Sequence, residues 1–251
     1  MAEDWDCYLA WVDDHSAMVF VDLGQIEHAP DPQLPWLVQV TVALKSGRDD
    51  GLADEDETEE LYAVEDALFA TLSRGLRARY VGRVTTQGQR THYYYAQGAN
   101  DFAGGVAQAM AHHPQYEYTC RDGADEGWES YINLLYPSDL DMQSIQNRRL
   151  VDLLVEQGDD LSQPRDVDHW LYFPSEESRD QFLLQIAGTA FQVDASLTDE
   201  AHAEFRYALR LTRQDRVDLE SIDGLVSDLL LRARECGGEY DGWESAVVSG
   251  E

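Results

Sequence analysis

The sequence is poor in positive charge. It has 18 lysine and arginine residues against 49 aspartate and glutamate residues, so its formal net charge is −31 over 251 residues. Binding to nucleic acids needs clustered lysine and arginine, which neutralise the phosphates. Anionic lipid surfaces, like nucleic-acid phosphates, repel a protein with an excess of negative charge. We therefore expect no direct nucleic-acid binding and no membrane binding. The partners that this charge favours are basic protein segments.

Cysteine and long apolar runs are also scarce. Cys7, Cys120 and Cys236 are far apart and form no Cys-x-x-Cys pair, so the sequence predicts neither a disulfide framework nor a cysteine-based zinc site. No apolar run approaches the roughly 18 residues that span a bilayer. The segment Met1 to Asp6 has acids where a secretory signal has basic residues. These observations predict a cytoplasmic protein.

Lysine is almost absent, because Lys45 is the single lysine among the 18 cationic residues. With 43% hydrophobic and 10% aromatic residues, the chain can nevertheless bury a core and is expected to fold. Acid excess with scarce lysine also suits a salt-adapted cytoplasm, where surface carboxylates hold water. That alternative explains the charge without any partner, and it stays open.

The second half of the chain contains a regular order of strands and helices. Residues 166–173 alternate apolar with other side chains, which is the period-two pattern of a strand with two faces. A helix over 142–157, ending at Gly158, precedes this strand. The elements expected after it are a helix capped by Ser175, strands at 191–195 and 205–211, a helix capped by Asp218, and a strand at 240–248. The order is βαββαβ.

The first half repeats this order after an opening hairpin formed by residues 8–11 and 18–23. The expected elements are a strand at 36–44, a helix at 60–76, a hairpin at 80–96, helices at 102–111 and 128–135, and a strand at 116–120 between them. The acid-rich segment 49–60 is expected to be a loop that runs into the first helix. The sequence thus predicts the α+β class, with two ferredoxin-like (βαββαβ) sandwich domains in tandem, an extra N-terminal hairpin and flanking helices. The expected domains are residues 1–136 and 141–251, joined by the linker 137–139.

The second half resembles a known family, the regulators of ribonuclease activity of the B type. The shared features are a helix that ends at Gly158, a strand that carries His169 before an aromatic residue, and the terminal segment Glu239-Tyr240-Asp241-Gly242-Trp243. The similarity covers roughly residues 141–249. Members are acidic bacterial proteins that bind and inhibit ribonuclease E, so the resemblance implies a role in regulating RNA turnover. The family usually has paired histidines on that strand, whereas Asp168 precedes His169 here.

The first half resembles a separate bacterial domain family of unknown function that is often joined to the regulator domain. The residues that carry this resemblance are Trp5, Tyr8, Phe20, Asp22, the run Tyr93 to Tyr95, Trp128 and Tyr131. It implies no activity.

No segment carries a motif for catalysis, because a nucleophile elbow, a phosphate-binding loop, a dinucleotide fingerprint and an HExxH motif are all missing. We therefore predict a protein that is not an enzyme, with no catalytic residue, no metal and no cofactor. The enzyme alternative is a metal-assisted hydrolase that uses Asp159, Asp160 and His169. For His169 the more ordinary interpretation is a hydrogen-bonded histidine at the edge of the core, and for the two aspartates it is a turn.

The leading hypothesis is an acidic regulator that binds a basic protein segment, with ribonuclease E as the partner that the resemblance implies. On the strand at 166–173, the apolar set is expected to face the helices, which sends Trp170 and Tyr172 to the opposite face. We expect that face to be covered by the first domain, a second subunit or the partner, so an oligomer stays open. The candidate partner-binding residues are Asp159, Asp160, Asp168, Trp170, Tyr172, Tyr240, Asp241 and Trp243.

Overall fold

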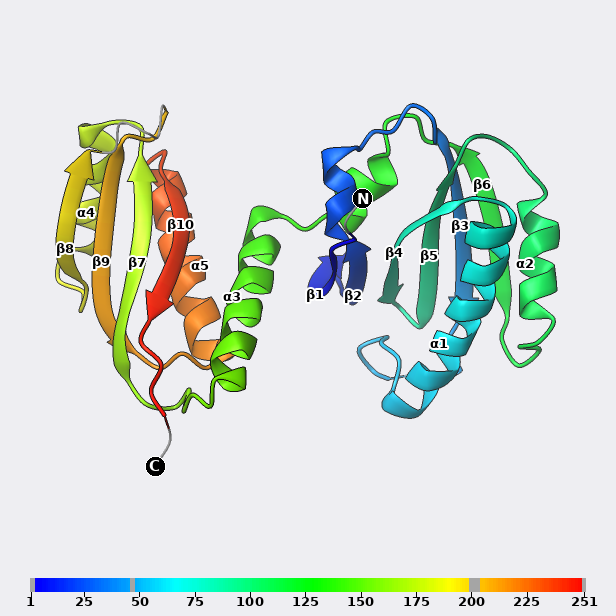
Figure 1. Cartoon of the computed structure of the whole chain (residues 1–251), viewed down its shortest axis with the longest axis horizontal. Helices are drawn as coiled ribbons and strands as arrows, with labels where there is room; N and C mark the ends of the chain where they lie inside the picture. Colours follow the sequence, from blue (N-terminus) through cyan, green and yellow to red (C-terminus); the bar gives the residue numbers. More distant parts are fainter. Residues whose placement is uncertain (1–2, 46–47, 199–203, 250–251) are drawn as a thin grey trace. The chain divides into compact units, whose positions relative to one another are not determined.

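The computed structural model describes residues 3–45, 48–198 and 204–249. The chain forms two compact units, Met1–Asp141 and Met142–Glu251, and each has a hydrophobic core of its own. Each unit combines an antiparallel sheet with helices (Figure 1), which confirms the α+β class. No helix in the described part of the chain is both long enough and apolar enough to cross a membrane.

The first unit contains a six-stranded sheet in the order β1-β2-β4-β5-β3-β6, and every pairing is antiparallel. Its strands are β1 (Trp5–Val12), β2 (His15–Asp22), β3 (Trp36–Ala43), β4 (Arg79–Thr86), β5 (Gln89–Ala96) and β6 (Tyr118–Ala124). Helices α1 (Glu55–Phe69) and α2 (Phe102–Met110) connect β3 to β4 and β5 to β6. Short helices are η1 (Leu23–Glu27), η2 (Ala70–Gly75) and η3 (Tyr131–Leu135). The opening hairpin extends the sheet by pairing β2 with β4.

The two faces of this sheet follow from alternation along its strands. In β3, Val38, Val40 and Val42 are fully buried and belong to one core cluster with Leu61 and Leu68 of α1. Successive side chains of a strand point to opposite faces, so Tyr93 and Tyr95 lie on the other side from Tyr94. On that other side, the ring of Tyr95 stacks on Trp128 with centroids 4.0 Å apart. The sheet is therefore covered on both faces.

Helix α1 begins earlier than the sequence pattern predicts, at Glu55 and not near Glu60. The reason is a cap: the side chain of Asp54 accepts a hydrogen bond from the backbone N–H of Glu57. Acidic residues in the first turn also interact favourably with the positive end of the helix dipole. The last part of the expected loop at 49–60 is therefore helical.

Two other expectations for the first unit are corrected. The helix expected at 128–135 begins after Trp128, at Glu129, because Trp128 has φ +52°, a left-handed value that a right-handed helix cannot include. The last strand covers Tyr118–Ala124 and not 116–120, because it follows β3 along its whole length, from Tyr118 opposite Val42 to Ala124 opposite Trp36.

The second unit contains a four-stranded antiparallel sheet in the order β10-β7-β9-β8. Its elements are α3 (Asp139–Glu156), β7 (Arg165–Phe173), α4 (Glu176–Ile186), β8 (Gln192–Thr198), β9 (Tyr207–Asp215), α5 (Leu219–Glu235) and β10 (Glu239–Ser245). Residues of α3, α4 and α5 share one core cluster with β7 and β9, so the helices cover a single face of the sheet (Figure 1). Ser175 and Asp218 cap α4 and α5 as predicted.

The bounds of several second-unit elements differ from the sequence expectations, and strand β8 covers Gln192–Thr198 and not 191–195. Helix α3 already begins at Asp139. The hydroxyl of Ser138 donates to the carboxylate of Asp141 and accepts from its backbone N–H, which stabilises the first turn. The linker is therefore shorter than the expected 137–139. Strand β9 begins at Tyr207, because pairing with β7 starts there opposite Phe173. Strand β10 ends at Ser245, where its pairing with β7 stops opposite Val167.

Candidate protein-binding face

Strand β7 separates the core of the second unit from its helix-free face. Val167, His169, Leu171 and Phe173 are 0% exposed, as their alternation predicts. Asp168, Trp170 and Tyr172 therefore point to the opposite face, where each is partly buried. This confirms the predicted direction of the two aromatic side chains within this unit.

Cross-strand pairing places the neighbours of these side chains. Residues that lie opposite each other in a sheet share a face. From β9, Arg210 lies opposite Trp170 and Thr212 lies opposite Asp168. From β10, Glu239 lies opposite Tyr172 and Glu244 opposite Asp168. We name this set, with Asp166 of β7 and Asp194 of β8, the open face; its members are Asp166, Asp168, Trp170, Tyr172, Asp194, Arg210, Thr212, Glu239 and Glu244.

Arg210 is the centre of the polar contacts on the open face. Its guanidinium lies 5.6 Å from the centroid of the Trp170 ring. Its Nη2 atom donates to Asp168 Oδ2 at 2.6 Å and lies 3.8 Å from Asp194 Oδ2. The hydroxyl of Thr212 contacts both of these carboxylates. The hydrogen bond to Asp168 raises the pKa of Arg210 above its ordinary value.

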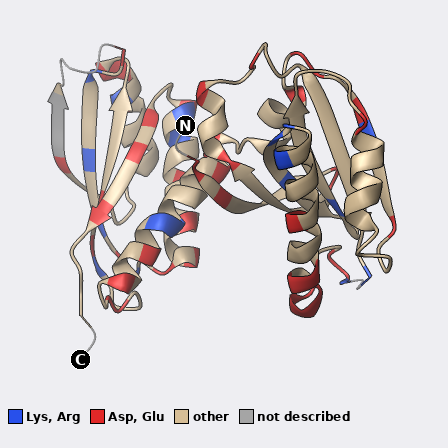
Figure 2. Ribbon diagram, turned by 45° about the vertical axis from the view of Figure 1, so that its right-hand side comes forward, with Lys and Arg blue, Asp and Glu red and all other residues tan. Residues whose placement is uncertain are grey.

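The open face as defined carries an excess of negative charge. Five acidic side chains surround one arginine, and Asp166, Glu239 and Glu244 are exposed. Figure 2 shows that acidic residues are spread over the elements of both units, while basic residues are few. Charge alone therefore does not distinguish this face; the aromatic side chains beside the carboxylates do.

Asp159 is not available on the surface, which corrects its place among the candidate contacts. Its side chain is 0% exposed and pairs with Arg165, whose side chain is 5% exposed. The same carboxylate accepts a hydrogen bond from the backbone N–H of Val248 at 2.8 Å. Burial acts to raise the pKa of Asp159, but the hydrogen bonds from Arg165 and Val248 hold it below its ordinary value. The pair anchors the segment that follows β10.

Asp160 forms the turn that the sequence suggests. Its carboxylate accepts hydrogen bonds from the hydroxyl of Ser162 at 2.7 Å and from the side-chain amide of Gln163 at 3.2 Å. Hydrogen bonding to Ser162 lowers the pKa of Asp160. The side chain is partly exposed, so a partner can still reach it.

The terminal aromatic residues face inward, which corrects two more candidates. Trp243 is 8% exposed, and its indole Nε1 donates to Asn147 Oδ1 of α3 at 2.9 Å. Tyr240 is partly buried, with its hydroxyl 2.9 Å from His169 Nδ1. Between them, the register with β7 shifts at Asp241, which makes a β-bulge beside Gly242. Asp241 is exposed and remains a candidate contact.

His169 belongs to the core and not to a metal centre. It is fully buried, and burial lowers its pKa to about 4, so the ring is neutral at pH 7. Among the described residues, no group of three or more histidine, cysteine, aspartate or glutamate side chains is placed to hold a metal ion. The structure therefore does not bring Asp159, Asp160 and His169 together as the hydrolase alternative requires.

Sequence reasoning missed part of the open face. Asp166 was not named although it shares the strand of Trp170, and Asp194, Thr212, Glu239 and Glu244 join the face only through strand pairing between segments that are distant in the chain. The available signal was the period-two pattern, which assigns Asp166 and Asp168 to the face of Trp170. Extending it to other strands needs the register, which no local pattern contains.

The fold and this face define a two-domain α+β protein whose second domain presents aromatic side chains among carboxylates. A family model described as "Family of unknown function (DUF695)" matches residues 3–136. Because this match covers more than half of the chain, the chain belongs to that family. The model described as "Regulator of ribonuclease activity B" matches residues 144–245, so both resemblances and their order are confirmed. The second family is one of regulators and not of catalysts.

Other comparisons add little. No curated protein matches the chain. A solved structure titled "Crystal Structure of an Unknown Protein from Galdieria sulphuraria" has 13% sequence identity and a TM-score of 0.22, over 85% of this chain and 99% of that chain.

Proposed function

We propose that this chain is a non-catalytic cytoplasmic regulator that binds a ribonuclease through its second unit. The bound element in this proposal is a basic segment, such as the arginine-rich scaffold region of ribonuclease E. The observation that carries the proposal is the match of residues 144–245 to the regulator of ribonuclease activity B family. The net charge of −31 supports a basic partner. We also propose that both units are ferredoxin-like sandwiches, on the strength of their strand orders.

The open face suits arginine-rich segments for two reasons. Exposed carboxylates such as Glu239 and Glu244 can accept hydrogen bonds from incoming guanidinium groups. The ring of Tyr172 lies in the same cross-strand row as Glu239, so a guanidinium bound there can also contact an aromatic ring. Arg210 already lies over Trp170, so the face binds a guanidinium this way within the chain itself.

Residues that support this face are distinct from those that contact the partner. Asp168, Trp170, Tyr172, Asp241 and Asp160 stay as proposed contacts, together with the acids of the open face. Asp159, Tyr240 and Trp243 instead hold β10 and the segment after it against the rest of the unit. Their substitution should affect binding only through stability.

A charge-matched pair of variants tests the proposal. The double variant Glu239→Gln/Glu244→Gln removes two charges from the open face. The control Asp228→Asn/Glu235→Gln removes two exposed charges from α5, which lies on the other side of the sheet. Binding of the full chain is measured against ribonuclease E with and without its arginine-rich scaffold region, at two salt concentrations.

We expect the open-face variant to bind at least about tenfold more weakly, because each lost charge-assisted contact is worth roughly 1 kcal/mol. The control should keep its affinity, and higher salt should weaken binding of the unmodified chain. An equal loss of affinity in both double variants would mean that binding depends on the net charge of the chain and not on the open face. Binding that survives removal of the scaffold region would reject the basic segment as the target.

A further inference from the structure

The first unit contains a pocket on the face of its sheet that α1 covers. Its volume is about 360 Å³, within the range of small-molecule sites. It lies between the opening hairpin, the β4–β5 hairpin and the start of α1. The residues that line it are Cys7, Met18, Phe20, Arg48, Leu52, Ala53, Thr58, Tyr62, Arg83, Thr85 and Arg90.

Positive charge is concentrated in this pocket. Three of the 18 cationic residues of the chain line it, and none of its described lining residues is acidic. Arg48 is balanced by Asp50, which its Nε and Nη2 atoms contact at 3.0 and 2.5 Å. Arg83 is balanced by Glu65, whose two oxygens lie 2.6 Å from its Nη1 atom.

Arg90 forms no ion pair of its own with any residue that the structure describes: it lies in the field of Glu65, but that carboxylate is hydrogen-bonded to Arg83. It is 5% exposed, and its Nε atom donates to the hydroxyl of Thr85 at 2.9 Å. Its Nη1 atom is buried and has no hydrogen-bond partner among the described residues. Burial, and after it the positive charge of Arg83, lowers the pKa of Arg90. An arginine nevertheless stays protonated in proteins, so the pocket wall keeps one unbalanced buried positive charge.

The histidine next to this cluster does not change the balance. His92 is fully buried, and burial, followed by the charges of Arg90 and Arg83, lowers its pKa well below the ordinary value. It is therefore neutral, and it neither adds to the positive charge nor offsets it. Arg83 and Arg90 share the single carboxylate of Glu65, so the two arginines keep one positive charge that Glu65 does not balance.

Apolar and aromatic side chains form most of the rest of the pocket. The guanidinium of Arg83 lies 4.2 Å from the ring centroid of Phe20 and 5.5 Å from that of Tyr62. Met18, Leu52 and Ala53 add apolar surface, and the remaining lining residues are Cys7, Thr58 and Thr85. Such a lining favours a ligand with an apolar body beside its charged group.

We infer that this pocket binds a small organic anion, whose carboxylate or phosphate pairs with Arg90 while its apolar body contacts Phe20 and Tyr62. This ligand site belongs to the first unit and is independent of the protein-binding face proposed above.

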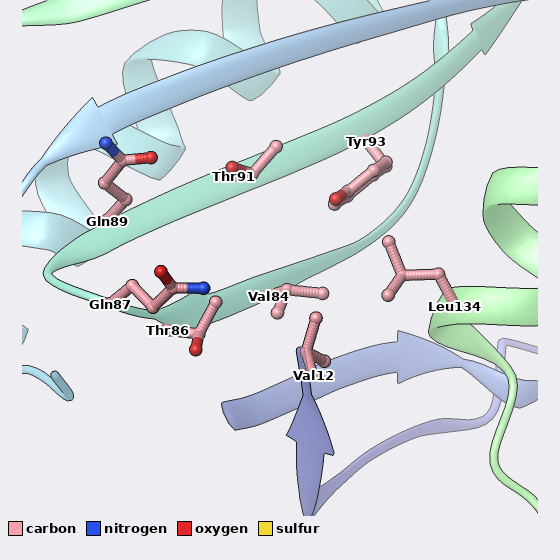
Figure 3. A pocket seen from close by; sticks show the side chains of 8 residues that line it. All are labelled: Val12, Val84, Thr86, Gln87, Gln89, Thr91, Tyr93 and Leu134. Atoms are coloured by element: carbon pink, nitrogen blue, oxygen red, sulfur yellow. The ribbon is translucent and has the colours of Figure 1, made fainter. Parts of the chain in front are cut away.

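A second hollow in the same unit is lined by uncharged residues, in contrast to the arginine-lined pocket (Figure 3). Its volume is about 190 Å³, and it lies on the other face of the sheet, because Thr91 and Tyr93 alternate with Arg90 and His92. Its lining residues, Val12, Val84, Thr86, Gln87, Gln89, Thr91, Tyr93 and Leu134, are all uncharged. It provides no counter-charge for an anion, so the inference concerns the arginine-lined pocket alone.

Three small probes test the inference on the full chain by calorimetry and thermal unfolding. Phenylacetate and phenyl phosphate carry an anionic group on an aromatic body, and phenylacetamide is the neutral counterpart. We expect both anions to bind and to raise the unfolding temperature, and phenylacetamide to bind at least tenfold more weakly. Whichever anion binds more tightly distinguishes a carboxylate ligand from a phosphate ligand. Absence of binding by both anions at millimolar concentration, or equal binding of phenylacetamide, would overturn the inference.

Two variants locate the site. Arg90→Met removes the unbalanced charge, so the ligand-free protein should unfold at a higher temperature while its affinity for the anions falls at least tenfold. The control Arg79→Gln changes an arginine of the same sheet that pairs with Asp31 outside the pocket, and it should keep the affinity. Unchanged anion affinity in Arg90→Met would reject the site.

Met18→Glu provides a second readout if Arg90→Met does not fold. It places a carboxylate of similar size in the pocket wall, so it should raise the unfolding temperature and compete with the added anions. A Met18→Glu protein that binds the anions as tightly as the unmodified chain would also reject the site.

Discussion

Trp243 and Asn147 connect the last strand of the second unit to its first helix. The indole Nε1 of Trp243 donates to Oδ1 of Asn147 at 2.9 Å. The amide nitrogen of Asn147 donates in turn to Asp223 Oδ1 at 2.7 Å, and Ser144 donates to the other oxygen of that carboxylate. One buried amide therefore joins β10, α3 and α5.

This relationship predicts a large effect for Asn147→Leu. The substitution leaves the buried indole N–H without an acceptor and removes a donor from the carboxylate of Asp223. The expected loss is about 2–4 kcal/mol in the free energy of unfolding. Gln157→Leu, at an exposed position just after the same helix, should change it by less than about 0.5 kcal/mol. Urea unfolding followed by tryptophan fluorescence measures both; similar values for the two variants would contradict the role of Asn147.

The ion pair between Asp159 and Arg165 predicts a contrast between neighbouring aspartates. Asp159→Asn leaves the nearly buried Arg165 without its counter-charge, which should cost about 3 kcal/mol. Asp160→Asn alters only a partly exposed turn and should destabilise the chain much less than Asp159→Asn does. Chemical denaturation at pH 7 measures both values. If the two variants are equally stable, the buried pair does not hold the segment after β10.

The buried His169 predicts a pH dependence with a definite sign. Its folded-state pKa of about 4 lies below the ordinary value of 6.5, so the unfolded chain binds the proton first as the pH falls. This contribution to stability is complete above pH 6.5 and is lost as the pH falls toward 4. At pH 5 the loss amounts to about 2 kcal/mol.

The measurement compares variants, because many carboxylates also titrate in this range. The stability advantage of the unmodified chain over His169→Gln should shrink by about 2 kcal/mol between pH 7.5 and pH 5. Phe173→Leu, a core variant without a titrating group, should keep a constant difference from the unmodified chain. A constant difference for His169→Gln as well would show that this histidine does not titrate on unfolding.

The two separate cores predict separate unfolding of the units. Glu65→Gln removes the partner of Arg83 in the first unit, and Asn147→Leu acts in the second. Scanning calorimetry should show two transitions, and each variant should lower only the one that belongs to its unit. Glu59→Gln, at an exposed position of α1, is the matched control for Glu65→Gln. A single transition that both variants shift equally would indicate that the units unfold together.

The sequence by itself determined the local features of this protein. Ser175 and Asp218 cap helices because their side chains accept hydrogen bonds from backbone groups three residues ahead, which needs no distant partner. The alternation in 166–173 separated the core side of β7 from the open face, because side chains of a strand alternate with period two. The two family resemblances rested on such local patterns as well, and both match.

Only the tertiary structure decided which polar groups are engaged. His169 meets Tyr240 across 71 positions of the chain, and Trp243 meets Asn147 across 96. Asp159 was a candidate contact as a charged residue in a turn, and Trp243 as a member of the terminal segment 239–243, yet Val248 and Asn147 hold them inside from distant positions of the chain. The positive charge left over by Arg83 and Arg90 is equally invisible in the sequence, because it depends on both arginines sharing the one carboxylate of Glu65. Pairing between distant segments brings these groups together. The strand register that sets this pairing cannot be read from the residue types alone.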